Sequence, residues 1–191
     1  DYNKSYYKFK VGKSGLCRIN QAALSALGMG STPAEYFQLW RNGEEVRIFT
    51  STPTGPLGSS DYIEFWAKMN DGIPDKTLYR QAGFQLSDSF SIHSDTAAYF
   101  LTINQSASNL RYVNAANNVA GNTLTPDAYF FRKVTMAYKN QYNRGYAVLV
   151  GEYVYSSSYD MGEGWSSYDA YPCCDIFKEF TGLNVYTAGC R

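Results

Sequence analysis

A single histidine limits the acid–base chemistry available to this chain. His93 is the only histidine among 191 residues, so every Ser/His or Cys/His mechanism would have to use it. Its neighbours Ser91, Ser94 and Asp95 are typical of a turn at the end of a strand. We therefore interpret His93 as a surface or turn residue and predict that the chain is not an enzyme.

Two carboxylates stand beside glycines and a tryptophan in the segment DMGEGW. Asp160, Glu163 and Trp165 could together suit a sugar or a calcium ion. The segment lacks the alternating oxygen ligands of a calcium loop, however, and the chain contains no Walker loop, GxSxG or HExxH motif. We favour an edge loop in which Glu163 accepts backbone N–H bonds and Trp165 packs on the sandwich, and we predict no metal and no cofactor.

Aromatic residues are unusually abundant, with 18 Tyr, 11 Phe and 3 Trp. Such residues suit extended strands and also exposed binding faces. Core filling and cross-strand pairing explain most of them. Exposed rings could form a platform for a cell-surface glycan, and Trp40, Trp66 and Trp165 are the tryptophans available for it.

The four cysteines leave two interpretations open. Cys17, Cys173, Cys174 and Cys190 have no zinc-site spacing. The adjacent residues Cys173 and Cys174 cannot easily pair with each other, but in an oxidising compartment one of them could close a loop with Cys190 or Cys17. The alternative is four buried or partly free thiols.

The charge and hydropathy patterns disfavour two classes of partner. Seventeen basic residues balance seventeen acidic ones without runs of either sign, which argues against nucleic acid. No stretch approaches 18 apolar residues, and no signal-peptide pattern opens the chain, so we predict no membrane insertion. Because the chain begins at Asp1 and stops after Arg191, we expect a mature or engineered piece, which could also be truncated.

The elements that must position these residues are mostly strands. The segment Tyr6–Ile19 predicts a hairpin of two short strands, with Tyr7, Phe9 and Val11 on one face. Asn20 caps a short helix over Ala22–Leu27, and Gly28 ends it.

Turn residues separate the later predicted strands. Asn42-Gly43 predicts a hairpin within Phe37–Phe49. Asp61–Lys68 predicts a strand with Ile63 and Phe65 inward and Tyr62, Glu64 and Trp66 outward. Further strands are predicted over the following ranges: Leu78–Leu86, Ala97–Asn104, Tyr129–Tyr138 and Gly145–Tyr155.

Strands at this spacing predict a mainly β protein, an antiparallel β-sandwich resembling a jelly roll, with one short helix near the N-terminus. We predict a β-sandwich domain over residues 1–165. Residues 166–191, which include a helical turn expected at Asp175–Phe180, are predicted to be an edge segment or a linker toward a further C-terminal domain.

Several ordered motifs resemble a known family. They are YYKFKVGKSGLCRINQAALSALG, FQLWRNGEEVRIF, DYIEFWAKMNDGIPDKTLYR, SDTAAYFLTIN and GEGW, spread over Tyr6–Trp165. In this order they resemble the region that precedes the peptidase domain in gingipain-like C25-family cysteine peptidases and the sortase-like proteins of the type IX secretion system of Bacteroidetes. Cys17 and His93 depart from the apolar residues usual at those positions, and the Cys173-Cys174 pair is unfamiliar.

The resemblance implies a non-catalytic, pro-domain-like β-sandwich of an exported protein, located in the periplasm, at the outer-membrane surface or outside the cell. It implies that the module assists folding, latency or positioning of a following C25-type peptidase domain. By the same resemblance, inhibition would use a basic side chain from a loop, and Arg111 and Arg144 are the candidates. The alternative is a carbohydrate-binding module, with Asp160, Glu163, Trp165 and Trp66 as candidate binding residues.

Overall fold

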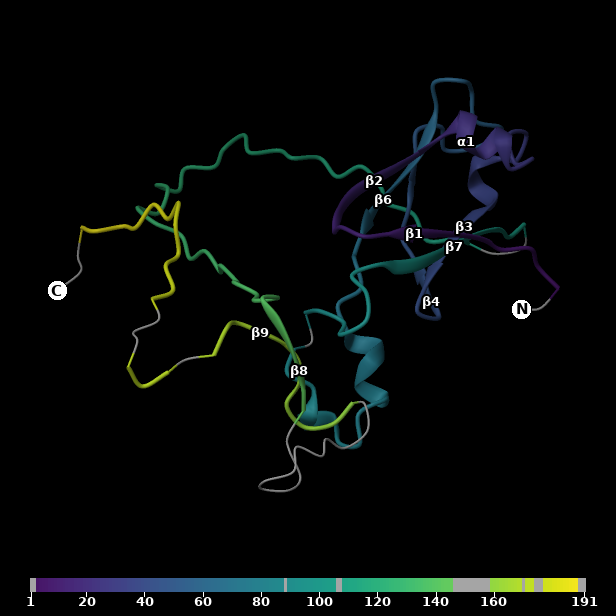
Figure 1. Ribbon diagram of the computed structural model, residues 1–191. Helices are drawn as coiled ribbons and strands as arrows, with labels where there is room; N and C mark the ends of the chain where they lie inside the picture. Colours follow the sequence, from purple (N-terminus) through teal and green to yellow (C-terminus); the bar gives the residue numbers. More distant parts are fainter. Residues whose placement is uncertain are drawn as a thin grey trace. The chain divides into compact units, whose positions relative to one another are not determined.

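The computed structural model describes residues 3–87, 89–105, 108–145, 159–169, 171–173 and 177–188. The chain is mainly β, with antiparallel sheets and few helices, as predicted (Figure 1). It divides into two compact units. Unit 1 comprises residues 1–82 and 87–115, and unit 2 comprises residues 83–86 and 116–191. The domain limits 1–165 and 166–191 stay a prediction.

Unit 1 contains two antiparallel sheets. The first has the strand order β1-β7-β3-β4 and the second the order β2-β6-β5. The strands are β1 (Tyr7–Val11), β2 (Gly15–Asn20), β3 (Phe37–Arg41), β4 (Glu44–Val46), β5 (Phe49–Thr50), β6 (Tyr62–Ala67) and β7 (Ala97–Ile103). The helices of the described residues are α1 (Gln21–Ala26) and three 3-10 helices, η1 (Ala34–Tyr36), η2 (Ile73–Thr77) and η3 (Ala82–Phe84).

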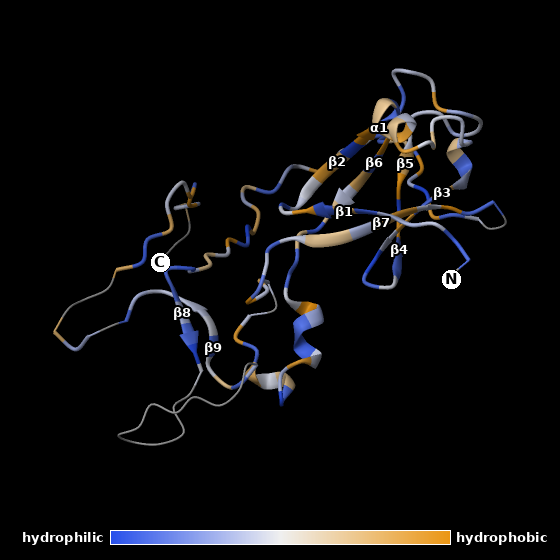
Figure 2. Cartoon of the chain, turned by 45° about the vertical axis from the view of Figure 1, so that its right-hand side comes forward, coloured by the Kyte–Doolittle hydropathy of each residue, from blue (hydrophilic) through white to orange (hydrophobic). Residues whose placement is uncertain are grey.

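The two sheets share one hydrophobic core. Phe9 of β1 and Tyr99 of β7 stack with ring centroids 5.7 Å apart, and Phe65 of β6 lies 5.3 Å from the Tyr99 ring. Alternation explains this arrangement, because Ile63 and Phe65 are buried while Trp66 is exposed, as predicted for this strand. Figure 2 shows hydrophobic and hydrophilic positions interspersed along β2, the strand that pairs with β6. The β-sandwich architecture and its jelly-roll topology stay predictions.

Two local predictions are confirmed in unit 1. The Asn20 side chain accepts a hydrogen bond of 2.9 Å from the backbone N–H of Ala23 and caps α1, and Gly28 ends the helix with a φ of 75°. Asn42 and Gly43 both have positive φ, 51° and 79°, and join β3 to β4 as a tight hairpin.

The predicted hairpin of residues 6–19 is wrong, although both of its strands form. β1 pairs with β7 and β2 pairs with β6, so the two strands lie in different sheets. The physical reason is that Phe9 and Ile19 must both face the same core, which lies between the two sheets. The short connection therefore takes the chain from one sheet to the other.

Two further predicted strands are absent from the described residues. Residues 78–86 form bends, turns and η3, and Tyr79 is buried while Leu78 and Leu86 are exposed, so no alternating face exists. Residues 129–138 have no regular structure, and Phe130 and Phe131 are both exposed. Aromatic content alone predicted strands here, without a partner strand to pair with.

Among its described residues, unit 2 contains a two-stranded sheet that the sequence did not predict, formed by β8 (Gln141–Arg144) and β9 (Glu163–Ser166). Of the strand predicted over 145–155, residues 146–155 lie outside the described residues, as do residues 175 and 176 of the expected helical turn. Residues 177–180 are not helical. None of the helices in the described part of the chain has the length and apolarity needed to cross a bilayer.

Candidate functional site

The strongest candidate site is the outer face of the β2-β6-β5 sheet, the face turned away from the core of unit 1. Apart from Asn20, which caps α1, register places six side chains on it, because paired residues of neighbouring strands point the same way. We call these residues the outer face: Leu16, Arg18, Phe49, Tyr62, Glu64 and Trp66.

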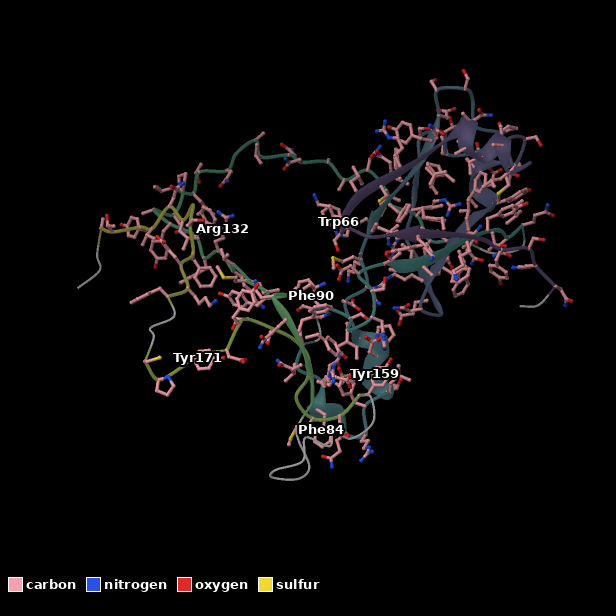
Figure 3. The ribbon with its side chains drawn as sticks, in the orientation of Figure 1. Trp66, Phe84, Phe90, Arg132, Tyr159 and Tyr171 are labelled. Carbon is pink, nitrogen blue, oxygen red and sulfur yellow. The ribbon has the colours of Figure 1, made fainter. Side chains whose placement is uncertain are left out.

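An exposed apolar pair occupies one end of the outer face. Leu16 and Trp66 are register partners in β2 and β6, and their exposed fractions are 65% and 56%. Figure 3 places Trp66 near the turn between β1 and β2. Large exposed apolar side chains that lie side by side are typical of contact surfaces for other molecules.

A charged pair lies in the middle of the outer face. Arg18 donates two hydrogen bonds to Glu64 Oε1, of 2.9 Å from Nε and 2.7 Å from Nη2. The Arg18 guanidinium also stacks on the Tyr62 ring, with its Cζ 3.8 Å from the ring centroid. Phe49 lies beside this ring, with the centroids 6.4 Å apart. The outer face thus combines aromatic rings with fixed polar groups.

The outer face suits contact and hydrogen bonding with another molecule. It carries neither a nucleophile nor a histidine, and His93 lies in an exposed bend elsewhere in unit 1. Within the described residues, no group of three or more His, Cys, Asp or Glu side chains could hold a metal ion. Stacking, apolar contact and hydrogen bonding to the Arg18–Glu64 pair are what it can offer.

The predicted acidic site lies in unit 2, and its residues serve the local backbone. Glu163 is buried and accepts hydrogen bonds from the Tyr142 hydroxyl at 2.5 Å, from the backbone N–H of Tyr159 and from that of Asp160 at 3.3 Å. The prediction that Glu163 accepts backbone N–H bonds is confirmed. Its carboxylate closes the turn of residues 159–163 and ties that turn to β8.

Trp165 and Asp160 belong to the same segment of unit 2 as Glu163. Trp165 contacts Tyr142 edge-to-face across the β8–β9 pair, with ring centroids 5.3 Å apart and 39% of the side chain exposed. Asp160 is buried. Trp66 belongs to the separate unit 1, so the four predicted binding residues do not form one site within either unit.

Arg111 has a structural position in unit 1. Its Nη2 donates to three main-chain carbonyls, those of Ala34 at 2.9 Å, Glu35 at 3.0 Å and Phe37 at 2.7 Å. Burial holds the pKa of Arg111 below its ordinary value, although the carboxylates of Glu45 and Glu35 oppose the shift. An inhibitory role for Arg111 would require breaking these bonds.

Arg144 lies at the end of β8 and not in a loop, and its side chain is exposed. Its partner in the register is Glu163. Arg144 is therefore the more accessible of the two predicted inhibitory arginines, and its role stays a prediction.

The described residues include two of the four cysteines, and the predicted disulfide pattern stays a prediction. Cys17 is a free, half-buried thiol whose side chain packs against the core of unit 1. Cys173 is exposed, and Cys174 and Cys190 lie outside the described residues. A disulfide within residues 173–190 stays a prediction.

Sequence reasoning found Trp66 but missed its neighbours Leu16, Arg18 and Phe49. The missing information was the register, because the sequence predicted that residues 15–19 pair with β1. The signal that could have found them is the alternation of Leu16 and Arg18 with Cys17 and Ile19, which marks an outward face.

Comparison with protein-family models, with curated proteins and with solved structures finds no match for this chain.

Proposed function

We propose that this chain is a non-catalytic binding module of an exported, gingipain-like protein, and that it assists folding, latency or positioning of a following C25-type peptidase domain. The ordered motifs from Tyr6 to Trp165 suggest the family, and the outer face supplies a contact surface. The single observation that carries the binding role is the exposed pair Leu16 and Trp66 on a regular sheet.

The geometry of the outer face suits a protein partner. Leu16 and Trp66 lie on paired strands and are held by the sheet, so little backbone freedom is lost when they are covered. Tryptophan is enriched among the residues that dominate interface energies. The Arg18–Glu64 pair next to them would lie at the polar rim, where charges set orientation more than affinity.

The test is titration of the purified chain into the exported C25-type peptidase of its own source organism, with calorimetry and peptide hydrolysis followed together. We expect binding that the double variant Leu16→Ala/Trp66→Ala weakens by roughly a hundredfold or more, as loss of a central anchor does. The matched control is Ile73→Ala/Leu78→Ala, which removes two equally exposed apolar side chains of unit 1 outside the outer face.

The outcomes separate the three roles. Binding with suppressed hydrolysis supports latency, and binding with unchanged hydrolysis supports positioning. Recovery of active peptidase from denaturant only in the presence of the chain supports assisted folding. If the chain neither binds nor assists refolding, the proposal is overturned.

A glycan is the second candidate partner, because rings and hydrogen-bonding groups adjoin on the outer face. Tyr62, Trp66 and the Arg18–Glu64 pair could stack on a sugar and bind its hydroxyls. Glycan-array binding that is lost in Trp66→Ala and kept in Leu16→Ala would favour this function. Equal losses in both variants would favour a protein surface.

A further inference from the structure

A groove separates the edges of the two sheets of unit 1, away from the exposed pair Leu16 and Trp66. Figure 1 shows β1 and β2 diverging from the turn that joins them. The space between them has a volume of about 640 Å³, within the range of roughly 300–1,000 Å³ typical of ligand sites. Its lining comes from four elements: Tyr7 and Phe9 of β1, Arg18 and Ile19 of β2, Ala23 of α1 and Leu101 of β7.

Both walls of the groove are sheet edges. Among the described strands, β1 pairs only with β7, and β2 pairs only with β6. An edge strand presents unpaired N–H and C=O groups along its free side. The groove therefore offers main-chain hydrogen bonding on its flanks and apolar side chains on its floor, where Phe9, Ile19 and Leu101 belong to the core or pack against it.

The positive charge of the side chains on these two edges indicates which kind of strand can bind there. Residues 7–26 contain Lys8, Lys10, Lys13 and Arg18 but no acidic residue, in a chain whose net charge is zero. Arg18 is neutralised by Glu64, whereas neither Lys8 nor Lys10 forms an ion pair within the described residues. Lysines on an edge discourage pairing with neutral or basic strands. A strand with acidic side chains would meet complementary charge instead.

We infer that the groove between β1 and β2 binds an extended segment of a partner protein, one that alternates apolar with acidic side chains and adds as a strand to these edges. Apolar side chains of the segment lie on the floor formed by Phe9, Ile19 and Leu101. Its acidic side chains point outward, toward Lys8 and Lys10 of β1. In strand addition of this kind, main-chain hydrogen bonds provide the affinity, and contacts of alternate side chains provide the specificity.

This inference does not depend on the proposed function. The groove and the outer face share only Arg18, and the pair Leu16 and Trp66 does not line the groove. Strand addition should therefore persist in Leu16→Ala/Trp66→Ala, which separates failure of one proposal from failure of the other.

The probe is a fluorescent, end-capped heptapeptide that alternates Val with Glu, and its binding to the whole chain is followed by fluorescence polarisation. A Val/Lys heptapeptide is the charge control. Two Val/Glu versions, each N-methylated at a different set of alternate amides, test main-chain bonding. We expect the Val/Glu peptide to bind, the Val/Lys peptide not to bind, and at least one methylated version to lose binding.

Charge reversal of the edge provides the second measurement. Lys8→Glu/Lys10→Glu should weaken Val/Glu binding by roughly tenfold or more and allow the Val/Lys peptide to bind. The control Lys68→Glu/Lys76→Glu reverses two exposed lysines of unit 1 outside the groove and should change neither affinity. Circular dichroism of both variants checks that they fold.

Hydrogen exchange locates the bound peptide. We expect added protection at backbone amides of residues 7–11 or 15–20 only. The inference is overturned if the Val/Glu peptide does not bind, if both methylated versions bind equally well, or if protection appears elsewhere. It is also overturned if the chain forms a dimer through β1 or β2 and the peptide binds only by competing with that dimer. The groove would then be occupied by a second copy of the chain.

Discussion

At the residue scale, polar side chains of this chain mostly secure backbone. Arg111 and Asp61 both do so, although either could be mistaken for a functional charge. Arg111 binds three carbonyls around η1 and the start of β3. Asp61 accepts hydrogen bonds from Ser51, Thr52 and the backbone N–H of Gly58 and so closes the loop before β6.

We predict that Arg111→Ala lowers the free energy of unfolding by about 1.5–3 kcal/mol, because hydrogen bonds to a charged group are lost and three carbonyls lose a donor. Arg144→Ala, at an exposed strand end, should change it by less than about 0.5 kcal/mol. Urea denaturation measures both. If a folded Arg111→Ala chain and Arg144→Ala both inhibit the peptidase as the wild type does, the inhibitory role of these arginines is wrong.

A second residue-scale prediction concerns pH. The Ser51 hydroxyl first, then the Gly58 N–H and the Thr52 hydroxyl, hold the pKa of Asp61 below its ordinary value of 3.8. A carboxyl group whose pKa is lower in the folded than in the unfolded chain stabilises the fold at pH values above its unfolded-state pKa. This stabilisation is lost as the pH falls through the folded-state pKa. The Tm of Asp61→Asn should therefore be below that of the wild type at neutral pH.

Calorimetric scans from about pH 6 to about pH 2 test this expectation. The Tm difference between the wild type and Asp61→Asn should shrink as the pH falls below 3.8. The control Glu44→Gln changes an exposed carboxylate in the β3–β4 hairpin, which accepts no such set of bonds in the described structure. A Tm difference that is constant over the whole range would contradict the prediction.

At the element scale, side chains join strands that are distant in the sequence. The Tyr99 hydroxyl of β7 accepts a hydrogen bond of 2.7 Å from the N–H of Lys68, just after β6, and donates one of 3.0 Å to its carbonyl. It thereby links the two sheets of unit 1. In unit 2, Glu163 of β9 binds the hydroxyl of Tyr142 in β8.

Tyr99→Phe should lower the free energy of unfolding by about 1–3 kcal/mol, because the Lys68 N–H and carbonyl lose their buried partner. Burial raises the pKa of the Tyr99 hydroxyl in the folded chain above its value in the unfolded chain. The contribution of Tyr99 to the free energy of unfolding is therefore fully present below the unfolded-state pKa and is lost as the pH rises through the folded-state pKa. Urea denaturation at neutral and alkaline pH measures this. Tyr62→Phe on the outer face is the control, and an equal loss there would argue against the Lys68 link.

In Glu163→Gln, an NH2 group can take the place of the carboxylate oxygen that accepts hydrogen bonds from backbone N–H groups. We expect the β8–β9 pair to open locally because these bonds are lost. We expect amide exchange in Gln141–Arg144 to accelerate roughly tenfold, equivalent to about 1.4 kcal/mol. Asp169→Asn is the control, because Asp169 accepts an exposed bond from Gln141. Unchanged exchange in Glu163→Gln would show that this carboxylate does not hold the pair.

Local signals predicted the elements of unit 1 better than they predicted the pairing of its strands. Asn20 acts through its side chain on the N–H of Ala23, and Gly28 and Asn42-Gly43 act through their positive φ. These signals are local, so the short helix and the β3–β4 hairpin could be predicted. The pairing of β1 with β7 depends on a common core, which no local pattern encodes. The outward direction of Trp66 could be predicted from alternation within its own strand. Its pairing with Leu16 could not, because no local pattern shows which strand lies beside β6.

At the scale of the whole molecule, unit 1 contains everything its core requires. Both of its sheets and all the residues of its core cluster lie between Tyr7 and Ile103. We therefore predict that a fragment of residues 1–115 folds alone and unfolds cooperatively in urea. Tyr99→Phe should destabilise the fragment and the full chain equally, within about 0.5 kcal/mol. A fragment without a cooperative transition would contradict this.

The pairing of β1 with β7 also affects the time course of folding. Contacts between residues far apart in the sequence slow folding, because the loop must close before any contact stabilises it. During synthesis at about 5–20 residues per second, β1 emerges several seconds before β7 exists. In that interval Phe9 lacks Tyr99, the ring on which it stacks, so we expect newly made chains to expose the Phe9 side chain until β7 has been synthesised.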